Sequence, residues 1–473
     1  MSSLPARQSR PTARSDSQLV TAPCQVVGPQ TGTQSPGTDA VPQSDGRSPA
    51  QPRRLPVPGR VLVVAYHFPP QAGSSGLLRS LKFCRYLPEF GWTPTVLTIH
   101  PRAYDQVNDS QLTEISAEVE VVRAFGLDAR RHLSIRGAYP PALALPDRWA
   151  SWLLGAVPAG LHRIKKHDID VIFTTFPIAS AVLIGYLLHQ LTGKPWVVDL
   201  RDSMTEDEYP KDIRTRRVYR WIEGKVIRHA SKILFTAPGA IRMYRQRYPQ
   251  LNAERCLLLP NGYDEADFAG IAAQCEPGRK IRLLHSGLIY PWERDPRPFF
   301  RALARLKAEG QISQETLSVE LRACGSEAEF QKDVAALGIG DLVHFLPALP
   351  YRAALQDAAN ADALLLLQAE CCDHQVPAKA YEYLRLQKPV LALTTAAGDT
   401  ASLLNQAGGG TIVDLADEDA ICQALPNFVR QVREGTHPLP SIAECRVFSR
   451  RNQAERLAHC LRDVVESLRP AAR

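Results

Sequence analysis

Short apolar runs alternate with amphipathic helical segments along most of the chain, and the alternation starts a second time near its middle. Runs of about four to eight residues rich in Val, Ile and Leu are typical of buried strands in parallel sheets. The first series of predicted strands comprises residues 61–65, 93–99, 119–124, 171–176, 195–200, 233–237 and 256–260. After a polar connector, the second series comprises 281–287, 318–325, 343–347, 361–368, 389–393 and 411–415. The predicted fold class is therefore α/β, with two Rossmann-like doubly wound domains facing across a cleft.

Composition sets the first of the predicted boundaries. Residues 1–58 are rich in Ser, Pro, Gln, Thr and Arg and poor in large apolar side chains. Such a segment cannot bury enough surface to offset the entropy of ordering, so we predict a disordered tail. An Arg-rich, acid-poor segment could alternatively be a transit peptide. The other predicted parts are an N-terminal domain at 59–272, a C-terminal domain at 273–445 and a C-terminal helix at 446–473.

Several bulk features favour a cytoplasmic protein. The most apolar window, residues 176–191, is shorter than the roughly 20 residues that span a bilayer, and a buried helix is expected there instead. The 10 cysteines include no C-x-x-C pair, which favours a reducing compartment over a disulfide framework. The net charge of +7 lies partly in the tail, and we expect no nucleic-acid partner.

One predicted helix has the composition of a membrane-surface element. Residues 147–166 combine Trp149, Trp152 and several leucines with a basic end that contains Arg163. An aromatic, basic helix of this kind could rest on the anionic inner face of the cell membrane, making the protein peripheral. A core-packed helix with a solvated end explains the same pattern equally well.

The loop after the first strand is a candidate anion site. Two prolines interrupt the chain there, and Gly73, Ser74, Ser75 and Gly76 lead into a helix. Unpaired N–H groups at a helix start, together with the helix dipole, favour a negatively charged ligand. The spelling is neither the G-x-G-x-x-G fingerprint nor a Walker loop, so NAD and ATP are not favoured. The alternative is a loop whose glycines serve only to turn the chain.

A second cluster of residues is a candidate metal site on composition alone. Cys371, Cys372, Asp373 and His374 are consecutive and all are potential ligands. Adjacent residues rarely ligate one ion without partners elsewhere in the sequence. We therefore predict no metal and no cofactor.

The order of several motifs resembles a known family. The segments "AYHFPPQAGSSG", "PWVVDLRDSM", "PNGYD", "LLHSGLIYPWERDPRPFFRAL" and "VPAKAYEYLRLQKPVLAL" resemble bacterial glycosyltransferases of the GT-B fold. More narrowly, residues 60–470 are similar to the retaining, metal-independent enzymes of glycosyltransferase family four. The resemblance implies transfer of a sugar from a nucleoside-diphosphate sugar to a saccharide or lipid-linked saccharide in polysaccharide or glycoconjugate synthesis. UDP is the default nucleoside diphosphate of the donor, on family frequency alone. It also implies a C-terminal helix that packs back on the first domain.

The resemblance also implies a donor site. The loop Gly73 to Gly76 would face the donor diphosphate, and Gly287 would begin a second glycine-containing loop. Family members commonly carry an Arg directly after that glycine and a second cation a few residues later. Here Leu288 replaces the first, and Arg294 lies near the position of the second. The alternative for Arg294 is an exposed ion pair with Glu293 or Asp295.

The segment from Pro377 to Leu393 carries the strongest motif. Pro377 suits the first turn of a helix, and Lys379 and Glu382 then share one helix face. By resemblance, Lys379 meets the diphosphate and Glu382 accepts both ribose hydroxyls; the alternative is one helical ion pair. The family's earlier acid in E-x7-E falls on His374. Either His374, Asp373 or Glu370 contacts the sugar, or backbone amides do.

The acceptor side is predicted at strand ends of the first domain. Arg201 and Asp202 follow the strand at 195–200, and His67 follows the first strand. An Arg–Asp pair could orient an acceptor hydroxyl or merely lock the loop, and His67 could face the cleft or be structural. The predicted catalytic residues are Arg294, Lys379 and Asp202.

Two other functions remain open from the sequence. A nucleotide-sugar epimerase can share the two-domain fold, although it would need acid and base groups around the sugar that we cannot identify. A non-catalytic nucleotide-sugar-binding scaffold is favoured by the two departures from the motif, at Leu288 and His374.

Overall fold

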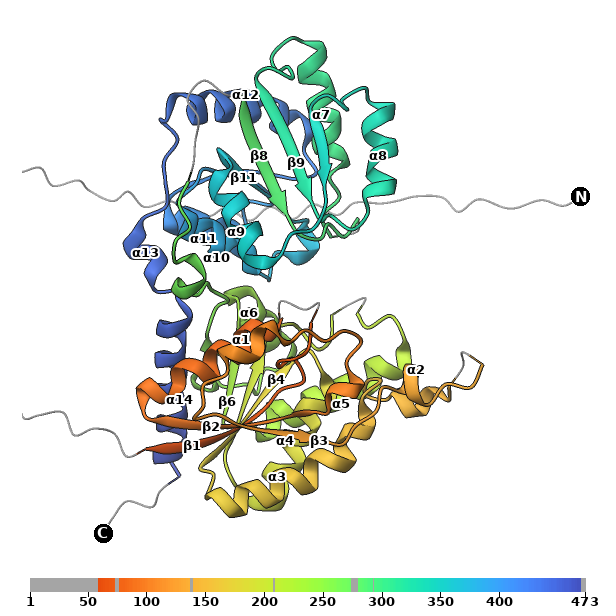
Figure 1. Ribbon diagram of the computed structural model, residues 1–473, viewed down its shortest axis with the longest axis vertical. Helices are drawn as coiled ribbons and strands as arrows, with labels where there is room; N and C mark the ends of the chain where they lie inside the picture. The colour runs from red at the N-terminus through yellow and green to blue at the C-terminus, as the bar shows by residue number, and fades with distance from the viewer. Residues whose placement is uncertain are drawn as a thin grey trace, which may run out of the picture. The chain divides into compact units, whose positions relative to one another are not determined.

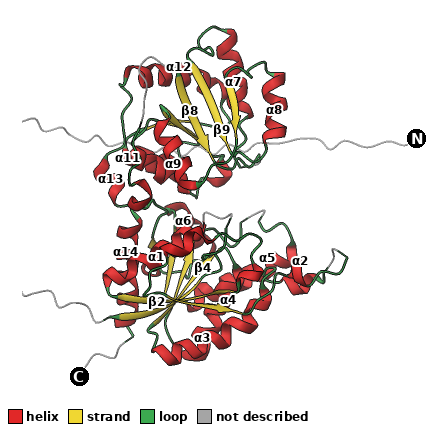
Figure 2. Cartoon of the chain, viewed as in Figure 1, coloured by secondary structure: helices red, strands yellow, loops and turns green. Residues whose placement is uncertain are grey.

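Two parallel sheets with helices on both faces make up the computed structural model, which describes residues 58–72, 76–136, 139–206, 209–273, 280–291 and 293–468. Figure 1 labels the elements, and Figure 2 shows strands enclosed by helices in both halves. The two halves are Rossmann-like domains, as predicted. The predicted tail lies almost entirely outside the described residues.

The first sheet has seven parallel strands in the order β3-β2-β1-β4-β5-β6-β7. The strands are β1 Gly59–Val64, β2 Trp92–Ile99, β3 Glu120–Ala124, β4 Val171–Phe176, β5 Trp196–Leu200, β6 Lys232–Phe235 and β7 Cys256–Leu258. The order reverses between β1 and β4, and the carboxyl ends of strands at such a switch point are where open α/β sheets bind ligands.

The second sheet has six parallel strands in the order β10-β9-β8-β11-β12-β13. The strands are β8 Ile281–Ser286, β9 Leu317–Arg322, β10 Val343–Leu346, β11 Ala363–Leu367, β12 Val390–Leu393 and β13 Gly410–Val413. Its switch point lies between β8 and β11. The two switch points place two sets of loops in equivalent positions on the two sheets.

Helices cover both faces of each sheet because successive strand side chains point to opposite sides. In β1, Leu62 and Val64 join the core on one face, and Val61 and Val63 join the core on the other. The helices of the first half are α1 Gly76–Tyr86, α2 Ala129–His132, α3 Leu153–His167, α4 Ala179–Thr192, α5 Ile213–His229 and α6 Pro238–Arg247. Those after β8 are α7 Arg297–Ala308, α8 Glu327–Ala336, α9 Tyr351–Asn360, α10 Ala378–Leu386, α11 Asp399–Ala407, α12 Glu418–Glu434, α13 Ile442–Arg446 and α14 Arg450–Glu466.

The last helix, α14, packs against the first sheet and not the second. Leu457, Leu461 and Val464 belong to the same apolar cluster as Val61 of β1. Trp92 Nε1 of β2 donates a hydrogen bond to the carbonyl of Ala458 over 3.1 Å. The first domain therefore completes one face of its core with residues from the far end of the described chain.

Every strand predicted from the sequence is present, and the differences lie at the ends. The strand predicted at 318–325 stops at Arg322, since Ala323 has a φ of +52°, which a strand cannot continue through. The strand predicted at 361–368 begins only at Ala363, because the N–H of Ala361 still bonds to Asp357 at the end of α9.

The aromatic, basic segment 147–166, for which a membrane surface and a core were equally open, packs its two tryptophans inward just before α3. Trp152 is fully buried, and Trp149 donates from Nε1 to the carbonyl of Ala103 over 3.2 Å. The Trp149 ring also lies 4.3 Å from the ring of Tyr66. The core-packed alternative is therefore the correct one for these aromatic residues, while Lys165 and Lys166 remain exposed.

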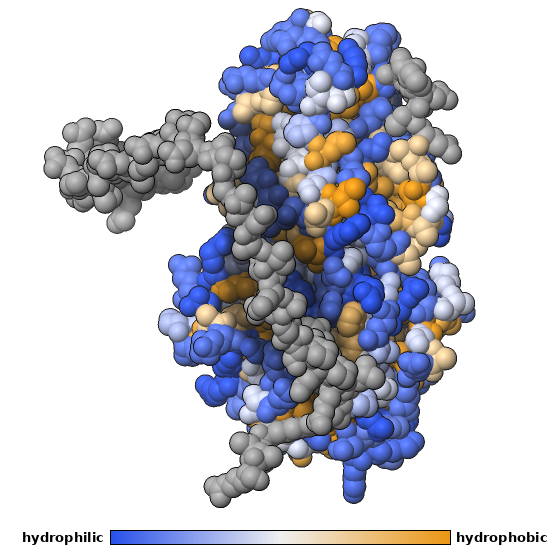
Figure 3. All heavy atoms as spheres, turned by 90° about the vertical axis from the view of Figure 1, so that its left-hand side faces the viewer, coloured by the Kyte–Doolittle hydropathy of each residue, from blue (hydrophilic) through white to orange (hydrophobic). Residues whose placement is uncertain are grey.

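The face that carries α13, on the left of Figure 1, is largely hydrophilic with separate apolar patches (Figure 3). Leu439, Ile442 and Val447, in and beside α13, are among its exposed apolar residues. Single exposed apolar side chains are usual on soluble proteins. Within the described part of the chain, no helix combines the length and the apolar character needed to cross a bilayer.

A buried arginine joins α1 to the end of the first sheet. Arg79 donates to both carboxylate oxygens of Asp199 in β5, over 2.9 and 2.8 Å. It also donates to the carbonyls of Leu259 and Pro260, over 2.9 and 2.7 Å. One guanidinium thus fixes a helix, a strand and the segment that leaves the first sheet.

Two helix glycines make opposite predictions for replacement by alanine. At Gly185 in α4, an added Cβ would overlap Thr174 and lie 2.7 Å from Trp196 Nε1, whereas at Gly224 in α5 it would meet nothing within 4 Å. We expect Gly185→Ala to lower the free energy of unfolding by about 1–3 kcal/mol through overpacking. Gly224→Ala is expected to raise it by about 0.5–1 kcal/mol, because alanine loses less backbone entropy in a helix. Urea denaturation of both variants measures the two effects, and equal effects at both sites would contradict the packing of α4.

Candidate functional site

The carboxyl end of β8 brings a glycine and a lysine together. Gly287 follows β8 with a φ of +118°, which favours glycine. A Cβ on this residue would lie 2.9 Å from Nζ of Lys379. A side chain at 287 would have to shift the end of the Lys379 side chain, while the positive φ is the main reason for the glycine.

Helix α10 supplies Lys379 from its first turn. Its N-cap residue, Pro377, makes no side-chain capping bond, so the N–H groups at the helix start lack that partner. Burial, together with the nearby charge of Arg294, lowers the pKa of Lys379 to about 7. The predicted helix is present with Lys379 and Glu382 three residues apart on it, but it begins at Ala378, so Pro377 is its N-cap residue and not part of its first turn.

Arg294 lies close enough to Lys379 to repel its charge. Its guanidinium donates to the carbonyl of Leu288 over 3.1 Å and lies 5.5 Å from the centre of the Tyr290 ring. Asp295, one of the two acids considered as its partner, pairs with Arg297 over 3.3 Å instead. Two cationic groups therefore converge beside Gly287, as an anion site needs.

Glu382 is held by a tyrosine and not by the lysine on its own helix. The hydroxyl of Tyr351, at the start of α9, donates to a carboxylate oxygen of Glu382 over 2.8 Å. The Nζ of Lys379 lies instead 3.1 Å from Nε2 of His285. Burial raises the pKa of Glu382. The helical ion pair considered from the sequence is thus not the arrangement that forms.

The residues before α10 point to separate partners. His374, where the family's earlier acid would stand, has Nε2 2.8 Å from a carboxylate oxygen of Glu206. Asp373 accepts from the Thr395 hydroxyl over 2.6 Å. The sulfur atoms of Cys371 and Cys372 are 3.8 Å apart. No cluster of three or more His, Cys, Asp or Glu side chains suited to a metal occurs among the described residues.

At the first sheet, Arg201 is used to hold loops together. It donates to the carbonyl of Phe176 over 2.7 Å and to the carbonyl of Gly76 at the start of α1. It also lies 3.4 Å from Nδ1 of His67. Asp202 next to it is exposed at the surface. The geometry supports a loop-locking role for Arg201.

His67 is a neutral hydrogen-bonding group. Burial and the charge of Arg201 lower its pKa to about 3. Because Arg201 only donates, Nδ1 of His67 accepts and Nε2 carries the proton. His67 can therefore donate to an oxygen at the switch point of the first sheet, but it cannot act as a base near neutral pH.

The first predicted anion loop is described only at its end. Gly73, Ser74 and Ser75 lie outside the described residues, and Gly76 is the first residue of α1. Their predicted contact with a diphosphate therefore stays a prediction.

Three residues of the site were not identified from the sequence: His285, Tyr351 and Glu206. His285 stands two positions before Gly287 in a quoted motif, and its place in β8 was the one available signal. Tyr351 and Glu206 are distant in sequence from their partners, and no spacing rule connects them.

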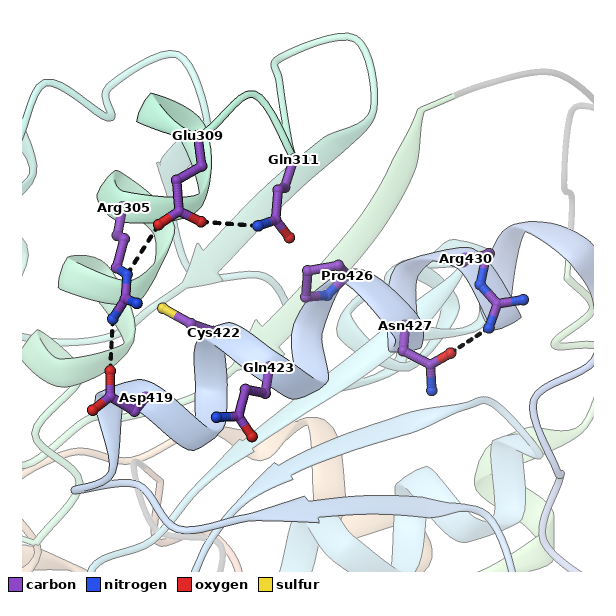
Figure 4. Close-up of a pocket in the computed structure, with 9 residues that line it drawn as sticks. All are labelled: Arg305, Glu309, Gln311, Asp419, Cys422, Gln423, Pro426, Asn427 and Arg430. Carbon is purple, nitrogen blue, oxygen red and sulfur yellow. Dashed lines mark hydrogen bonds and ion pairs between the residues drawn. The ribbon is translucent and has the colours of Figure 1, made fainter.

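The recess shown in Figure 4 lies elsewhere, between α7 and α12. Its charged side chains satisfy one another: Arg305 donates to Glu309 over 3.1 Å and to Asp419 over 2.6 Å. Glu309 also accepts from Gln311 over 2.8 Å. Because Arg305 pairs with Glu309 and Asp419, and Arg430 pairs with Glu434 over 3.4 Å, the convergence of Lys379 and Arg294 is the stronger candidate.

Comparison with known proteins gives one matching family model and a shared fold. Residues 75–262 match the model of the glycosyl transferase 4-like domain, which covers most of the first half. The fold as a whole is that of the GT-B glycosyltransferases. No curated protein matches the sequence.

Solved structures share the fold at low sequence identity. The sucrose-phosphate synthase of Thermosynechococcus elongatus is 15% identical, with a TM-score of 0.59 over 86% of this chain and 100% of that one. The HepE protein of Anabaena, solved with UDP and glucose, is 14% identical, with a TM-score of 0.59 over 86% and 100%. A putative UDP-N-acetylglucosamine 2-epimerase of Listeria monocytogenes is 11% identical, with a TM-score of 0.52 over 87% and 98%.

Proposed function

We propose that the protein is a glycosyltransferase that takes its sugar from a nucleoside-diphosphate sugar, with UDP as the expected nucleoside diphosphate. The observation that carries this proposal is the convergence of Lys379 and Arg294 beside Gly287 at the carboxyl end of β8. A diphosphate leaving group gains negative charge as the bond to the sugar breaks. Cationic groups and helix-start amides fixed in advance stabilise that charge, which is usually a large part of catalysis.

Glu382 gives the site its second anchor. A carboxylate three residues after Lys379 can accept hydrogen bonds from two vicinal hydroxyls, such as those of a ribose. Tyr351 holds one of its oxygens and so fixes its orientation. We infer that Lys379 and Glu382 together read a nucleoside diphosphate, with the charge at one end and the diol at the other. The HepE structure with UDP and glucose supports this choice of donor class.

For the acceptor we propose a hydroxyl of a saccharide or lipid-linked saccharide, bound near the switch point of the first sheet. His67 would donate to it and Asp202 would orient it. We further propose retention of the anomeric configuration, no requirement for a metal, and a role in polysaccharide or glycoconjugate synthesis in the cytoplasm. A lipid-linked acceptor would place the protein at the inner membrane face, through a surface other than Trp149 and Trp152.

One assay distinguishes the proposed transferase from the two other candidate functions. The fold shared with the Listeria epimerase favours epimerisation as the second candidate, and a binding scaffold is the third. A transferase consumes donor only when an acceptor is present, an epimerase changes the sugar without one, and a scaffold does neither.

The first experiment is calorimetry of the full chain with UDP, GDP and ADP, followed by incubation with the corresponding nucleotide-sugars. We expect one nucleoside diphosphate to bind, and its sugar to be released to an added saccharide, as followed by NMR of the anomeric proton. Absence of binding by all three would contradict the donor site. Binding without any turnover across an acceptor panel would favour the scaffold.

A further inference from the structure

His285 is a fully enclosed histidine directly behind the proposed donor site. It lies in β8 with 1% of its surface exposed. Its Nδ1 is 2.9 Å from the carbonyl oxygen of Leu365 in β11, and its Nε2 is 3.1 Å from the carbonyl oxygen of Gly287. Nε2 is also 3.1 Å from Nζ of Lys379. Both ring nitrogens therefore face fixed partners, and one of these partners can itself titrate.

The partners determine where the imidazole proton lies. Burial and the charges of Lys379 and Arg294 hold the pKa of His285 well below its usual range, so the ring is neutral. Both carbonyl oxygens only accept, and a neutral ring has one proton, so it can bond to only one of them. Leu365 provides the shorter contact, which assigns the proton to Nδ1 and leaves the contact of Nε2 with the Gly287 carbonyl without a hydrogen bond. The lone pair of Nε2 then accepts a hydrogen bond from the Lys379 ammonium. This bond is stronger while Lys379 is protonated, because an ammonium is a better donor than a neutral amine.

Burial is the largest influence on the Lys379 ammonium, and it lowers the pKa by opposing the charged form. Arg294, from the loop after β8, repels it, and Glu382, on the same helix, attracts it. Glu382 is shared, since it accepts from Tyr351 and also faces the charge of Arg450 at the start of α14. The neutral His285 contributes an acceptor but no charge. In the absence of an anion, the surroundings thus leave Lys379 close to losing its proton near neutral pH.

We propose that His285 is a positioning residue that holds the Lys379 ammonium beside Gly287, and that an anion bound at this site is accompanied by uptake of one proton by Lys379. The anion supplies the negative charge that the empty site lacks, so the bound form keeps its ammonium at a pH where the free form has lost it. The proposal deepens the donor-site assignment and rests on it for the choice of ligand. Its physical consequence is that donor affinity falls as pH rises through neutrality.

The proton count is measurable directly. At pH 8.0 a nucleoside diphosphate is fully ionised, and an amine of pKa about 7 is about nine-tenths deprotonated in the free protein. Titration of the full chain with UDP in buffers of different ionisation enthalpy should therefore show uptake of close to one proton. Lys379→Arg keeps the charge without titrating, and should bind UDP with an uptake near zero. Equal uptake by both proteins, or none by the wild type, would overturn the proposal.

The positioning role is tested by the pH profile and by rescue. His285→Leu removes the acceptor, so the midpoint at which UDP affinity falls should move to lower pH. His285→Gln retains an oxygen that can accept, and should restore the midpoint toward that of the wild type. A merely structural role would weaken binding at every pH without moving the midpoint. His344→Leu, in β10 of the same sheet, is the matched control and should leave the profile unchanged.

A measurement without nucleotide separates this proposal from the donor assignment. The protonation of Lys379 can be followed by NMR of its side chain across pH 5 to 10 in the full chain, with inorganic pyrophosphate as the added anion. We expect a titration near pH 7 that moves upward with pyrophosphate and downward in His285→Leu. An unshifted lysine titration in all three samples would overturn the coupling even if UDP binds, whereas failure of UDP alone would count against the donor assignment only.

Discussion

Replacing Lys379 with alanine is expected to weaken binding of the nucleoside diphosphate by about 10- to 100-fold. Loss of a hydrogen bond to a charged group costs about 1.5–3 kcal/mol, and each 1.4 kcal/mol is about tenfold in affinity. Glu382→Ala should weaken binding by a similar factor, since it removes the acceptor for the diol. Calorimetry measures both effects directly. The transfer rate should fall further in Lys379→Ala, because the lysine also stabilises charge that develops only as the sugar leaves.

A lysine elsewhere in the same domain controls for the charge change. Lys332 is exposed on α8, and Lys332→Ala removes one positive charge without touching β8 or α10. This variant should bind and turn over donor as the wild type does. If Lys332→Ala and Lys379→Ala weaken binding equally, the effect comes from net charge and the proposed site is wrong.

The largest loss of stability is expected at Arg79. Arg79→Ala leaves the Asp199 carboxylate buried without its cation, since the two side chains are 2% and 1% exposed. Breaking a buried ion pair by removing one partner costs about 3–5 kcal/mol. The carbonyls of Leu259 and Pro260 also lose their donor. We expect a lower midpoint of urea denaturation, measured by circular dichroism.

Arg451 offers a control with the same chemistry at the surface. It pairs with Glu89 over 2.6 Å, but the side chains are 57% and 42% exposed. Such pairs contribute about 0–1 kcal/mol, so Arg451→Ala should change the midpoint little. A similar small effect for Arg79→Ala would show that water reaches Asp199 in solution. Arg79→Met combined with Asp199→Leu should recover part of the loss, because neither charge is then left unpaired.

The fold was predictable because each strand has a local sequence pattern, a short apolar run, that indicates a buried strand. A run such as residues 171–176 has no hydrophilic face to place in water, and only a sheet covered on both sides accommodates it. The ends were less predictable, since they depend on single backbone angles such as that of Ala323. The segment 147–166 shows the same limit: its composition fits a membrane surface and a core equally well. The burial of Trp152 and the bond from Trp149 to Ala103 decide for the core at these two residues.

The candidate site was predictable where its residues share one helix. Pro377, Lys379 and Glu382 have fixed spacing, so their common face follows from the helix repeat. Partners brought by other elements do not follow in this way. Tyr351 reaches Glu382 from α9, and Glu206 reaches His374 from the loop after β5. Such contacts depend on the conformation of the loops that bring separate elements together. Hydrophobic periodicity carries no information about that conformation.

The position of α14 bears on how the protein is made. The ribosome completes β1 and α1 early, but the side chains that cover them, among them Leu457 and Leu461, are made only after the entire second sheet. During that interval one apolar face of the nascent first domain is exposed and can associate with other exposed apolar segments. The first domain therefore emerges first from the ribosome and finishes folding last, and we expect nascent chains stalled before α14 to be held by chaperones.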